Sequence, residues 1–507
     1  MKSPLVSVVD RARRLPTAFK RMRSQSSASA SGQACASEIY HLPPELWLHI
    51  FAFIAATASS SSRLQPAQIE AIRALALTCR AFRGLAQPLL FRRISTHSKI
   101  PKQTYVGLPA TKHQRRASLS ERQAFFLSPR IAAAVREICI DAQDLDDAET
   151  DAIFDGLFRF PNLKMLVCRN LRLSLWRIAT LHDLSLASIG LDSCETSDPA
   201  ISGPTGAVPP PLPLDGVAFK HPKTETMDDD ALVDLFSLFL APNRLQRLSS
   251  TSAQLIPALA LSSKPFTKLL HLEIPASSLH EPSFIAALSL CPSIRRLDIQ
   301  TERAVSSGSR LHTSIPTTLP PSVLPNLGIY RGPRNYASLF CYRPESEARV
   351  HTVELTSLSS APRLFQTLRS LPSKLENLVI RIDGEVPKTL FSTIHQRFPT
   401  LRSLSVNDPV LSFGPLREML NECAEEGTVL PSLRSLRVRV MGKERYNLWV
   451  PPAAEANDVI QMFGKLRADI GSVYPGLTSL KFVHGIENST VVWRATYPGN
   501  ELALVGR

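Results

Sequence analysis

The chain has 507 residues, 44 % of them hydrophobic and 20 % charged, and this composition excludes a wholly disordered protein. Its formal net charge of +14 is concentrated near the N-terminus, because residues 1–130 hold 20 Lys/Arg against 5 Asp/Glu, whereas residues 131–507 hold 38 against 39. Phosphate binding needs a concentrated cationic surface, so we expect no nucleic-acid partner for the fold as a whole.

The cysteines and the hydropathy pattern favour a protein of the cytoplasm or nucleus, or both, without a membrane partner. None of the eight cysteines stands in a CxxC pair or at a metal-like spacing from histidine, which is typical of reduced, mostly buried thiols. No secretory signal peptide is visible. The longest nearly continuous apolar stretch runs only from Leu46 to Ala58. This is too short for a membrane-spanning helix, which needs about 20 apolar residues.

Residues 1–37 are predicted to be a disordered, basic and serine-rich leader. Seven basic side chains face one acid, Asp10, and the serine-rich stretch that follows has no periodic apolar residues. Two other interpretations are open here, a nuclear-import signal at Lys20–Arg23 and a mitochondrial presequence. The helical segment that follows weighs against the mitochondrial one.

Residues 40–95 have helical periodicity in three short segments. Leu46 and Ile50 fall on one stripe of a first helix, and Pro66 is predicted to open a second. Gly84 is expected to break the pattern before a short third segment. Three short helices bury little apolar surface by themselves, so we expect the remaining apolar side chains to meet a partner.

This segment resembles an F-box over residues 38–97. Four pieces match the pattern in order: Leu42-Pro43-Pro44-Glu45-Leu46, Ile50-Phe51, Leu75-Ala76-Leu77-Thr78-Cys79-Arg80-Ala81-Phe82 and Pro88-Leu89-Leu90-Phe91. An F-box docks on a Skp-type adaptor of a cullin-RING ubiquitin ligase, and a second domain holds the substrate. The resemblance therefore implies adaptor-binding roles for Leu42, Pro43, Leu46, Ile50, Leu77, Cys79, Phe82 and Leu89.

A degenerate repeat occupies residues 131–485. Its unit reads Leu-x-x-Leu-x-apolar, often after a proline, as in Pro399-Thr-Leu401-Arg-Ser-Leu404-Ser-Val406. Eight first positions follow one another at a nearly constant interval, at 245, 269, 294, 324, 350, 375, 401 and 433. Further copies begin at 135, 163 and 477. The pattern resembles leucine-rich repeats, in which each unit opens with a short strand.

The predicted fold class is α/β: a short three-helix F-box followed by a leucine-rich-repeat-like solenoid, with strands on the concave side and helices on the convex side. The helices are expected at 228–240, 281–291, 386–398 and 454–466. Residues 98–130 are interpreted as a basic connector, and residues 486–507 as a C-terminal tail or cap. Two loop insertions are expected at 199–216 and 301–322.

No catalytic motif is present, since the sequence lacks GxGxxG, GxxxxGK[ST], GxSxG and HExxH. We therefore expect a protein that is not an enzyme, without catalytic residues, cofactor or metal. Asp144, Asp146 and Asp147 lack the glycine and glutamate spacing of a calcium loop. We interpret residues 141–151 as the start of a solvated helix.

Together these features, which resemble those of fungal F-box proteins with degenerate leucine-rich repeats, predict the substrate-recognition subunit of an SCF-type cullin-RING ubiquitin ligase. The F-box would dock on a Skp-type adaptor, and the solenoid would hold an unidentified protein substrate. Proximity then raises the effective concentration of the substrate. The alternative is a leucine-rich-repeat interaction scaffold that acts independently of the ligase.

Alternation along each repeat strand predicts which residues face a substrate. The fourth and sixth residues should point into the core, and the third, fifth and seventh onto the concave surface. This surface is mixed in sign in the earlier repeats and basic in the later ones, where the substrate-binding candidates are Arg381, Arg437, Arg439 and Lys481. Arginine forks match carboxylate and phosphate groups, so we expect an acidic or phosphorylated segment there. The alternative is a solvated basic face.

Overall fold

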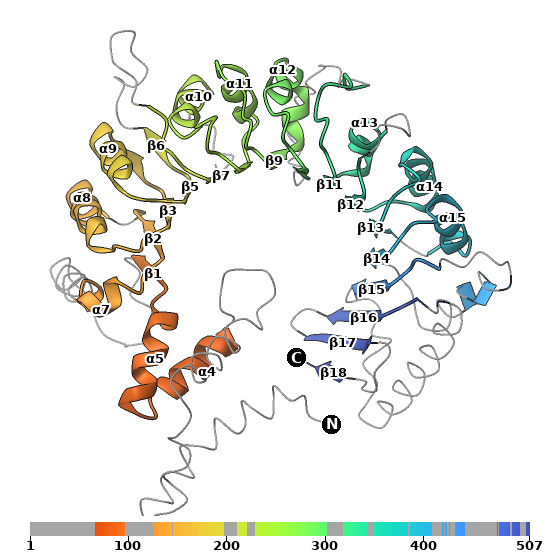
Figure 1. The fold of residues 1–507 in the computed structure, drawn as a ribbon, viewed down its shortest axis with the longest axis horizontal. Helices are drawn as coiled ribbons and strands as arrows, with labels where there is room; N and C mark the ends of the chain where they lie inside the picture. The colour runs from red at the N-terminus through yellow and green to blue at the C-terminus, as the bar shows by residue number, and fades with distance from the viewer. Residues whose placement is uncertain are drawn as a thin grey trace, which may run out of the picture.

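The chain forms a curved arc with a continuous sheet along its inner side and helices along its outer side (Figure 1). Helices α4 (Pro66–Ala76) and α5 (Arg80–Leu90) lie at one end of the arc, and the last strands lie at the other. The computed structural model describes residues 66–96, 125–143, 145–196, 210–220, 229–301, 318–342, 349–383, 386–407, 418–419, 421–422, 425, 431–441, 474, 476–486, 489–496 and 503–506.

The inner sheet of the described chain has 16 strands, and neighbours in the sheet follow the order of the chain. All neighbours from β1 to β16 are parallel, and β17 and β18 close the end in antiparallel pairing. The strands are β1 (Arg93–Thr96), β2 (Glu137–Asp141), β3 (Met165–Arg169), β5 (Ser188–Asp192), β7 (Gly216–Lys220), β8 (Arg247–Ser250), β9 (His271–Pro275), β10 (Arg296–Gln300), β11 (Ile329–Gly332), β12 (Thr352–Leu355), β13 (Asn377–Arg381), β14 (Ser403–Asn407), β15 (Ser435–Met441), β16 (Ser479–Ile486), β17 (Ser489–Thr496) and β18 (Ala503–Gly506). A separate small sheet pairs β4 (Arg172–Leu173) with β6 (Glu195–Thr196).

One hydrogen-bond pattern repeats at every parallel step of the inner sheet. The carbonyl after the first apolar residue of a repeat accepts two amide hydrogens from the next strand. Leu270 N and His271 N, for example, donate to Gln246 O at 2.9 and 3.1 Å. The pattern begins at Arg92 O and ends at Arg434 O. Equivalent repeat positions therefore form straight rows across the sheet.

The burial pattern confirms the predicted alternation. In the repeat that begins at Leu375, the fourth and sixth residues, Leu378 and Ile380, are fully buried. The third and seventh residues, Asn377 and Arg381, are partly exposed on the opposite face of β13. The core thus lies between the sheet and the outer helices, and the inner face carries the odd positions.

One repeat has a different register from the predicted one. Tyr330 pairs with Leu297 of β10, so this unit begins at Leu327 and not at residue 324. The core position holds a tyrosine because its hydroxyl donates to Pro333 O at 2.8 Å and its ring stacks on Phe340 at 5.6 Å. A pattern of aliphatic residues alone could not locate it.

The sequence pattern did not detect three further repeat units, which begin at Phe91, Leu186 and Leu214. The last of them corrects one part of the interpretation of 199–216 as a loop insertion: residues 210–215 have no helix or strand, but a repeat unit begins within them. Leu212 and Leu214 are each 1 % exposed, and β7 begins at Gly216. Residues 199–209 lie outside the described part of the chain, as do 1–37, 98–124, 302–317 and 454–466.

The outer layer consists of short helices between the strands (Figure 1). Three of them confirm the helices expected within 228–240, 281–291 and 386–398. The larger helices of the described solenoid are α8 (Asp147–Gly156), α9 (Leu175–Asp183), α10 (Asp229–Ser237), α11 (Leu255–Ala260), α12 (Phe284–Ser289), α13 (Ala337–Cys341), α14 (Ala361–Ser370) and α15 (Leu390–Arg397).

Candidate functional site

Helices α4 and α5 form a hairpin with a small core of its own. Ile72, Ala76 and Ala86 are buried, and partly buried apolar residues pack against them, namely Leu75, Phe82, Leu85, Leu89 and Leu90. Cys79 caps the N-terminus of α5, where its Sγ accepts a hydrogen bond from Phe82 N at 3.4 Å. The hairpin core is separate from the core of the solenoid.

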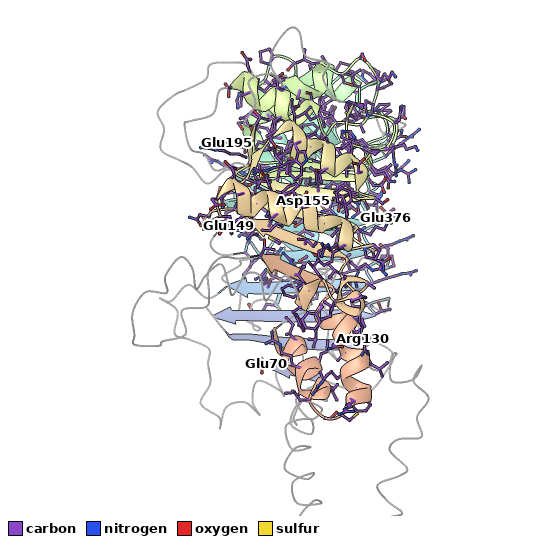
Figure 2. The ribbon with its side chains drawn as sticks, turned by 90° about the vertical axis from the view of Figure 1, so that its left-hand side faces the viewer. Glu70, Arg130, Glu149, Asp155, Glu195 and Glu376 are labelled. Atoms are coloured by element: carbon purple, nitrogen blue, oxygen red, sulfur yellow. The ribbon has the colours of Figure 1, made fainter. Side chains whose placement is uncertain are left out.

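Helix α5 runs unbroken from Arg80 to Leu90, so the expected break at Gly84 is wrong. An interior glycine costs a helix about 1 kcal/mol relative to alanine, and the burial of apolar residues on both sides of it offsets that cost. Arg130 of α7 (Pro129–Ala132) lies beside α5 (Figure 2). A Cβ added at Gly84 would lie 2.6 Å from its Nη2, so the glycine leaves room for this arginine.

The candidate adaptor-binding residues differ in their exposure. Leu77, in the turn between α4 and α5, is 77 % exposed and open to a partner. Cys79 is partly buried as the cap of α5, while Phe82 and Leu89 pack against the hairpin core. The other four, Leu42, Pro43, Leu46 and Ile50, lie outside the described residues.

A short connection joins the hairpin to the solenoid. Helix α5 ends at residue 90 and β1 begins at residue 93. Between them, Phe91 packs against the solenoid core, and its ring contacts Phe125 edge-on at 5.4 Å. In β1, Arg93 forms an ion pair with Glu137 of β2 at 3.1 Å. The direction of the hairpin relative to the sheet is therefore set by packing on both sides of the connection.

The centre of the inner face carries a buried carboxylate, Asp298 of β10, which is only 4 % exposed. Arg296 holds it with two parallel hydrogen bonds, from Nε to Oδ1 and from Nη2 to Oδ2, both at 2.9 Å. His271 Nε2 of the neighbouring strand lies 3.3 Å from Oδ2. Burial by itself would raise the pKa of Asp298, but the contacts with His271 and Arg296 outweigh it and hold that pKa below the ordinary value.

The charges around this carboxylate are also paired. Arg331 of β11 lies 3.2 Å from Glu354 of β12 and 4.0 Å from Asp298. Gln300 Nε2 donates to Glu273 of β9 at 3.0 Å. Each arginine of the strands β9 to β12 that faces inward thus has a carboxylate partner. We call this set, His271, Glu273, Arg296, Asp298, Gln300, Arg331 and Glu354, the central network.

The inner face of the later strands carries arginines without such partners. Neither Arg437 nor Arg439 of β15 has an ion pair with any described residue, and Arg437 Nε is buried without a hydrogen-bond acceptor. Burial lowers the pKa of Arg437, and the neighbouring charge of Arg439 lowers it further. Arg381 differs, because its Nη1 donates to Thr356 O at 3.1 Å. Lys481 pairs with Arg437 in the sheet register, and only its backbone is described.

The acidic segment 141–151 contains the start of a helix, as expected, since α8 begins at Asp147, although Asp141 is the last residue of β2. Asp146 caps α8 by accepting from Glu149 N at 2.8 Å. Asp147 and Asp151 pair with Arg177 of α9 at 3.1 and 2.7 Å. Figure 2 views these two helices from the outer side of the arc. Within the described ranges, no three His, Cys, Asp or Glu side chains are placed to hold a metal ion.

Comparison with known proteins identifies one part of the chain. Residues 39–97 match the family model described as F-box-like. Among solved structures, an internalin (inlF) from Listeria monocytogenes str. 4b F2365 is similar at 10 % identity, with a TM-score of 0.27 and coverage of 74 % of this chain and 90 % of the other. A TM-score this low does not establish a shared fold, so the description of the solenoid depends on its own strand ladder.

None of the curated proteins matches the sequence. Among the described helices, none combines the length and the apolar character that a membrane span requires.

Proposed function

We propose that this chain, an F-box-like region joined to a leucine-rich-repeat-like solenoid, is the substrate-recognition subunit of an SCF-type cullin-RING ubiquitin ligase. The F-box-like region docks on a Skp-type adaptor, and the inner face of the solenoid holds a protein substrate. The chain supplies no catalytic group and acts by proximity, which raises the effective concentration of the substrate near the ubiquitin-loaded partner. Its place of action is the cytoplasm, the nucleus or both.

The observation that carries the proposal is the F-box-like match at 39–97, which includes α4 and α5 and continues through the first strand of the sheet. A bound adaptor would thus have a fixed direction relative to the solenoid, because only two residues separate α5 from β1. The curvature of the arc also brings the C-terminal strands round toward the α4–α5 end (Figures 1 and 2). Both features favour the transfer of ubiquitin to a protein held inside the arc.

Leu77 gives the sharpest test of adaptor docking. A Leu77→Asp change places a charge in an apolar interface but leaves the fold intact, because this side chain is 77 % exposed. Co-purification of the full chain with a Skp-type adaptor should fall at least about tenfold, the equivalent of 1.4 kcal/mol. Leu261→Asp is the matched control, since Leu261 is 75 % exposed at the C-terminal cap of α11 in the solenoid, and this variant should co-purify normally.

A second variant tests the first predicted helix. Leu46→Ala combined with Ile50→Ala should abolish co-purification while the solenoid keeps its thermal unfolding transition. Normal adaptor recovery by both this variant and Leu77→Asp would contradict docking through this segment. Failure of the unmodified protein to bind any Skp-type adaptor would instead favour the ligase-independent scaffold.

A further inference from the structure

We infer that the inner face of β14–β16 binds an acidic, extended segment of a partner protein, with Arg437 and Arg439 as its main contacts. Arg381 and Lys481 lie at the margins of this surface, which we call the late basic face. The inference depends on the proposed function in one respect, since the partner is taken to be the substrate that the solenoid holds. The binding surface itself is argued from the contacts of the described residues.

The register of the sheet places these cations in two rows. The row at the fifth repeat position runs across Val379, Ser405, Arg437 and Lys481. The row at the seventh position runs across Arg381, Asn407, Arg439 and Val483. Neither row contains an acid, so no carboxylate of the sheet neutralises the arginines from a neighbouring strand.

The third row, at the edge of this surface, is uncharged and rich in hydroxyl groups. It consists of Asn377, Ser403, Ser435 and Ser479. Together with Asn407, these short side chains offer hydrogen-bond donors and acceptors to a chain lying over the sheet. The surface therefore combines fixed positive charge with small polar groups, a combination that complements an acidic polar segment.

Arg437 and Arg439 have no carboxylate partner among the described residues, and this observation points to a ligand. Buried guanidinium N–H groups are normally paired, and an unpaired one costs stability. Arg437 Nε has no acceptor, and its neighbour Arg439 repels it. The central network shows that the same sheet supplies carboxylates to inward-facing arginines elsewhere. A carboxylate from a partner would accept hydrogen bonds from the arginines of β15, as Asp298 accepts hydrogen bonds from Arg296.

The spacing of the charges favours an extended acidic segment over a single phosphate group. Alternate residues of a strand are about 7 Å apart, and strands two apart in a sheet are separated by about 10 Å. Arg437 and Arg439 are alternate residues of one strand, about 7 Å apart, and Arg381 and Arg439 lie two strands apart, at about 10 Å. Acidic residues two apart on an extended peptide repeat at about 7 Å as well. Several carboxylates spread along a segment thus fit this surface better than one concentrated charge.

Peptide binding to the full-length protein tests the inference. The probe is a fluorescein-labelled peptide of about 12 residues that alternates glutamate and serine, long enough when extended to cross all the strands of the surface. Binding is followed by anisotropy, and we expect it to weaken as salt is added, because the contacts are ionic. Arg437→Glu combined with Arg439→Glu should weaken it at least about tenfold, and the two Arg→Gln changes should cause a smaller loss.

The matched control reverses two charges elsewhere on the same sheet. Lys220→Glu with Arg247→Glu alters exposed positions of β7 and β8 and changes the net charge by the same amount. Its affinity for the probe should stay within about twofold of the unmodified protein, since exposed charges more than a Debye length away are screened. Unchanged thermal unfolding of all variants shows that they fold.

Four outcomes would overturn the inference. They are equal binding of a glutamine–serine peptide, equal loss in the β7–β8 control, no loss in the β15 variants, and tighter binding of a peptide that carries a single phosphoserine. The last outcome would assign the surface to phosphorylated segments. Adaptor co-purification of the unmodified protein separates the two proposals. If the unmodified protein recovers the adaptor but does not bind the peptide, the late basic face alone is refuted. If it binds the peptide but recovers no adaptor, the ligase role alone is refuted.

Discussion

The central network and the late basic face both present inward-facing arginines of one sheet, and Arg331 and Arg437 hold the same repeat position, but their surroundings differ. In the centre, Arg296 and Arg331 each meet a carboxylate within 3.2 Å. At β15, Arg437 and Arg439 meet no carboxylate among the described residues. The first arrangement stabilises the fold, because a buried Asp298 lies between its cations. The second leaves charge available for a partner at some cost in stability.

The comparison shows that an inward-facing arginine in a solenoid is not in itself a binding residue. Paired guanidinium groups are already satisfied, and a ligand would have to break existing contacts to use them. Unpaired groups gain contacts when a ligand arrives. Accordingly, removal of a charge should destabilise the centre and leave the late face as stable as before, or more stable.

The largest effect is expected from Asp298→Ala. The change leaves Arg296 without its two hydrogen-bond acceptors and Arg331 without one of its two carboxylates. The free energy of unfolding should fall by about 2–3 kcal/mol, measured by urea denaturation of the full chain. Glu354→Gln is the control, because its half-exposed pair with Arg331 should contribute about 0.5 kcal/mol. Equal losses in the two variants would contradict the special role of the buried carboxylate.

A smaller effect is expected in the dependence of stability on pH. The pKa of Asp298 is lower in the folded chain than the value of about 3.9 in an unfolded one. Its contribution to stability is therefore complete above that value and is lost as the pH falls through the folded-state pKa. Asp298→Asn should flatten the acid side of a urea-denaturation series between about pH 2 and 5. An unchanged acid limb would show that Asp298 has no depressed pKa.

The smallest effect is expected from Arg437→Met. Methionine keeps the apolar stem and removes a partly buried cation that has no acceptor at Nε. The free energy of unfolding should stay constant or rise by up to about 1 kcal/mol. The acid limb should keep its shape, because an arginine stays charged throughout that range even with a lowered pKa. A loss of stability comparable to that of Asp298→Ala would remove the contrast between the two regions.

Much of the fold could be predicted from the order of residues. The spacing of Leu401, Leu404 and Val406 and of its copies predicted parallel strands with one buried face, and the predicted alternation holds in β13 and β15. The pattern failed where the core residue was aromatic, at Tyr330, and where glycine and proline surrounded the repeat, before β7. Both of these repeat units pack as the other units do, but their residue types differ from those that define the pattern.

The structure of the candidate adaptor segment could also be predicted only in part. Helix α4 begins at Pro66, as predicted, but α5 continues through Gly84. A glycine is a local signal for a helix end, whereas the burial of Ala86 and its neighbours depends on a second helix. Exposure could not be predicted either. Leu77 and Phe82 are close in the sequence and equally apolar, and only their packing shows that one is open to a partner and the other contributes to the core.

By itself, the sequence determined the repeating unit, the face of each strand on which a side chain lies, and the likeness of residues 38–97 to an F-box. Apart from Arg296, whose partner Asp298 lies two residues away on the same strand, only the tertiary structure decided which inward-facing cations are neutralised. The reason is that the contacts cross between strands: His271 of β9 reaches Asp298 of β10, and Arg331 of β11 reaches Glu354 of β12, in each case from one repeat to the next. Alternation fixes the direction of a side chain, while the register between neighbouring repeats fixes its partner.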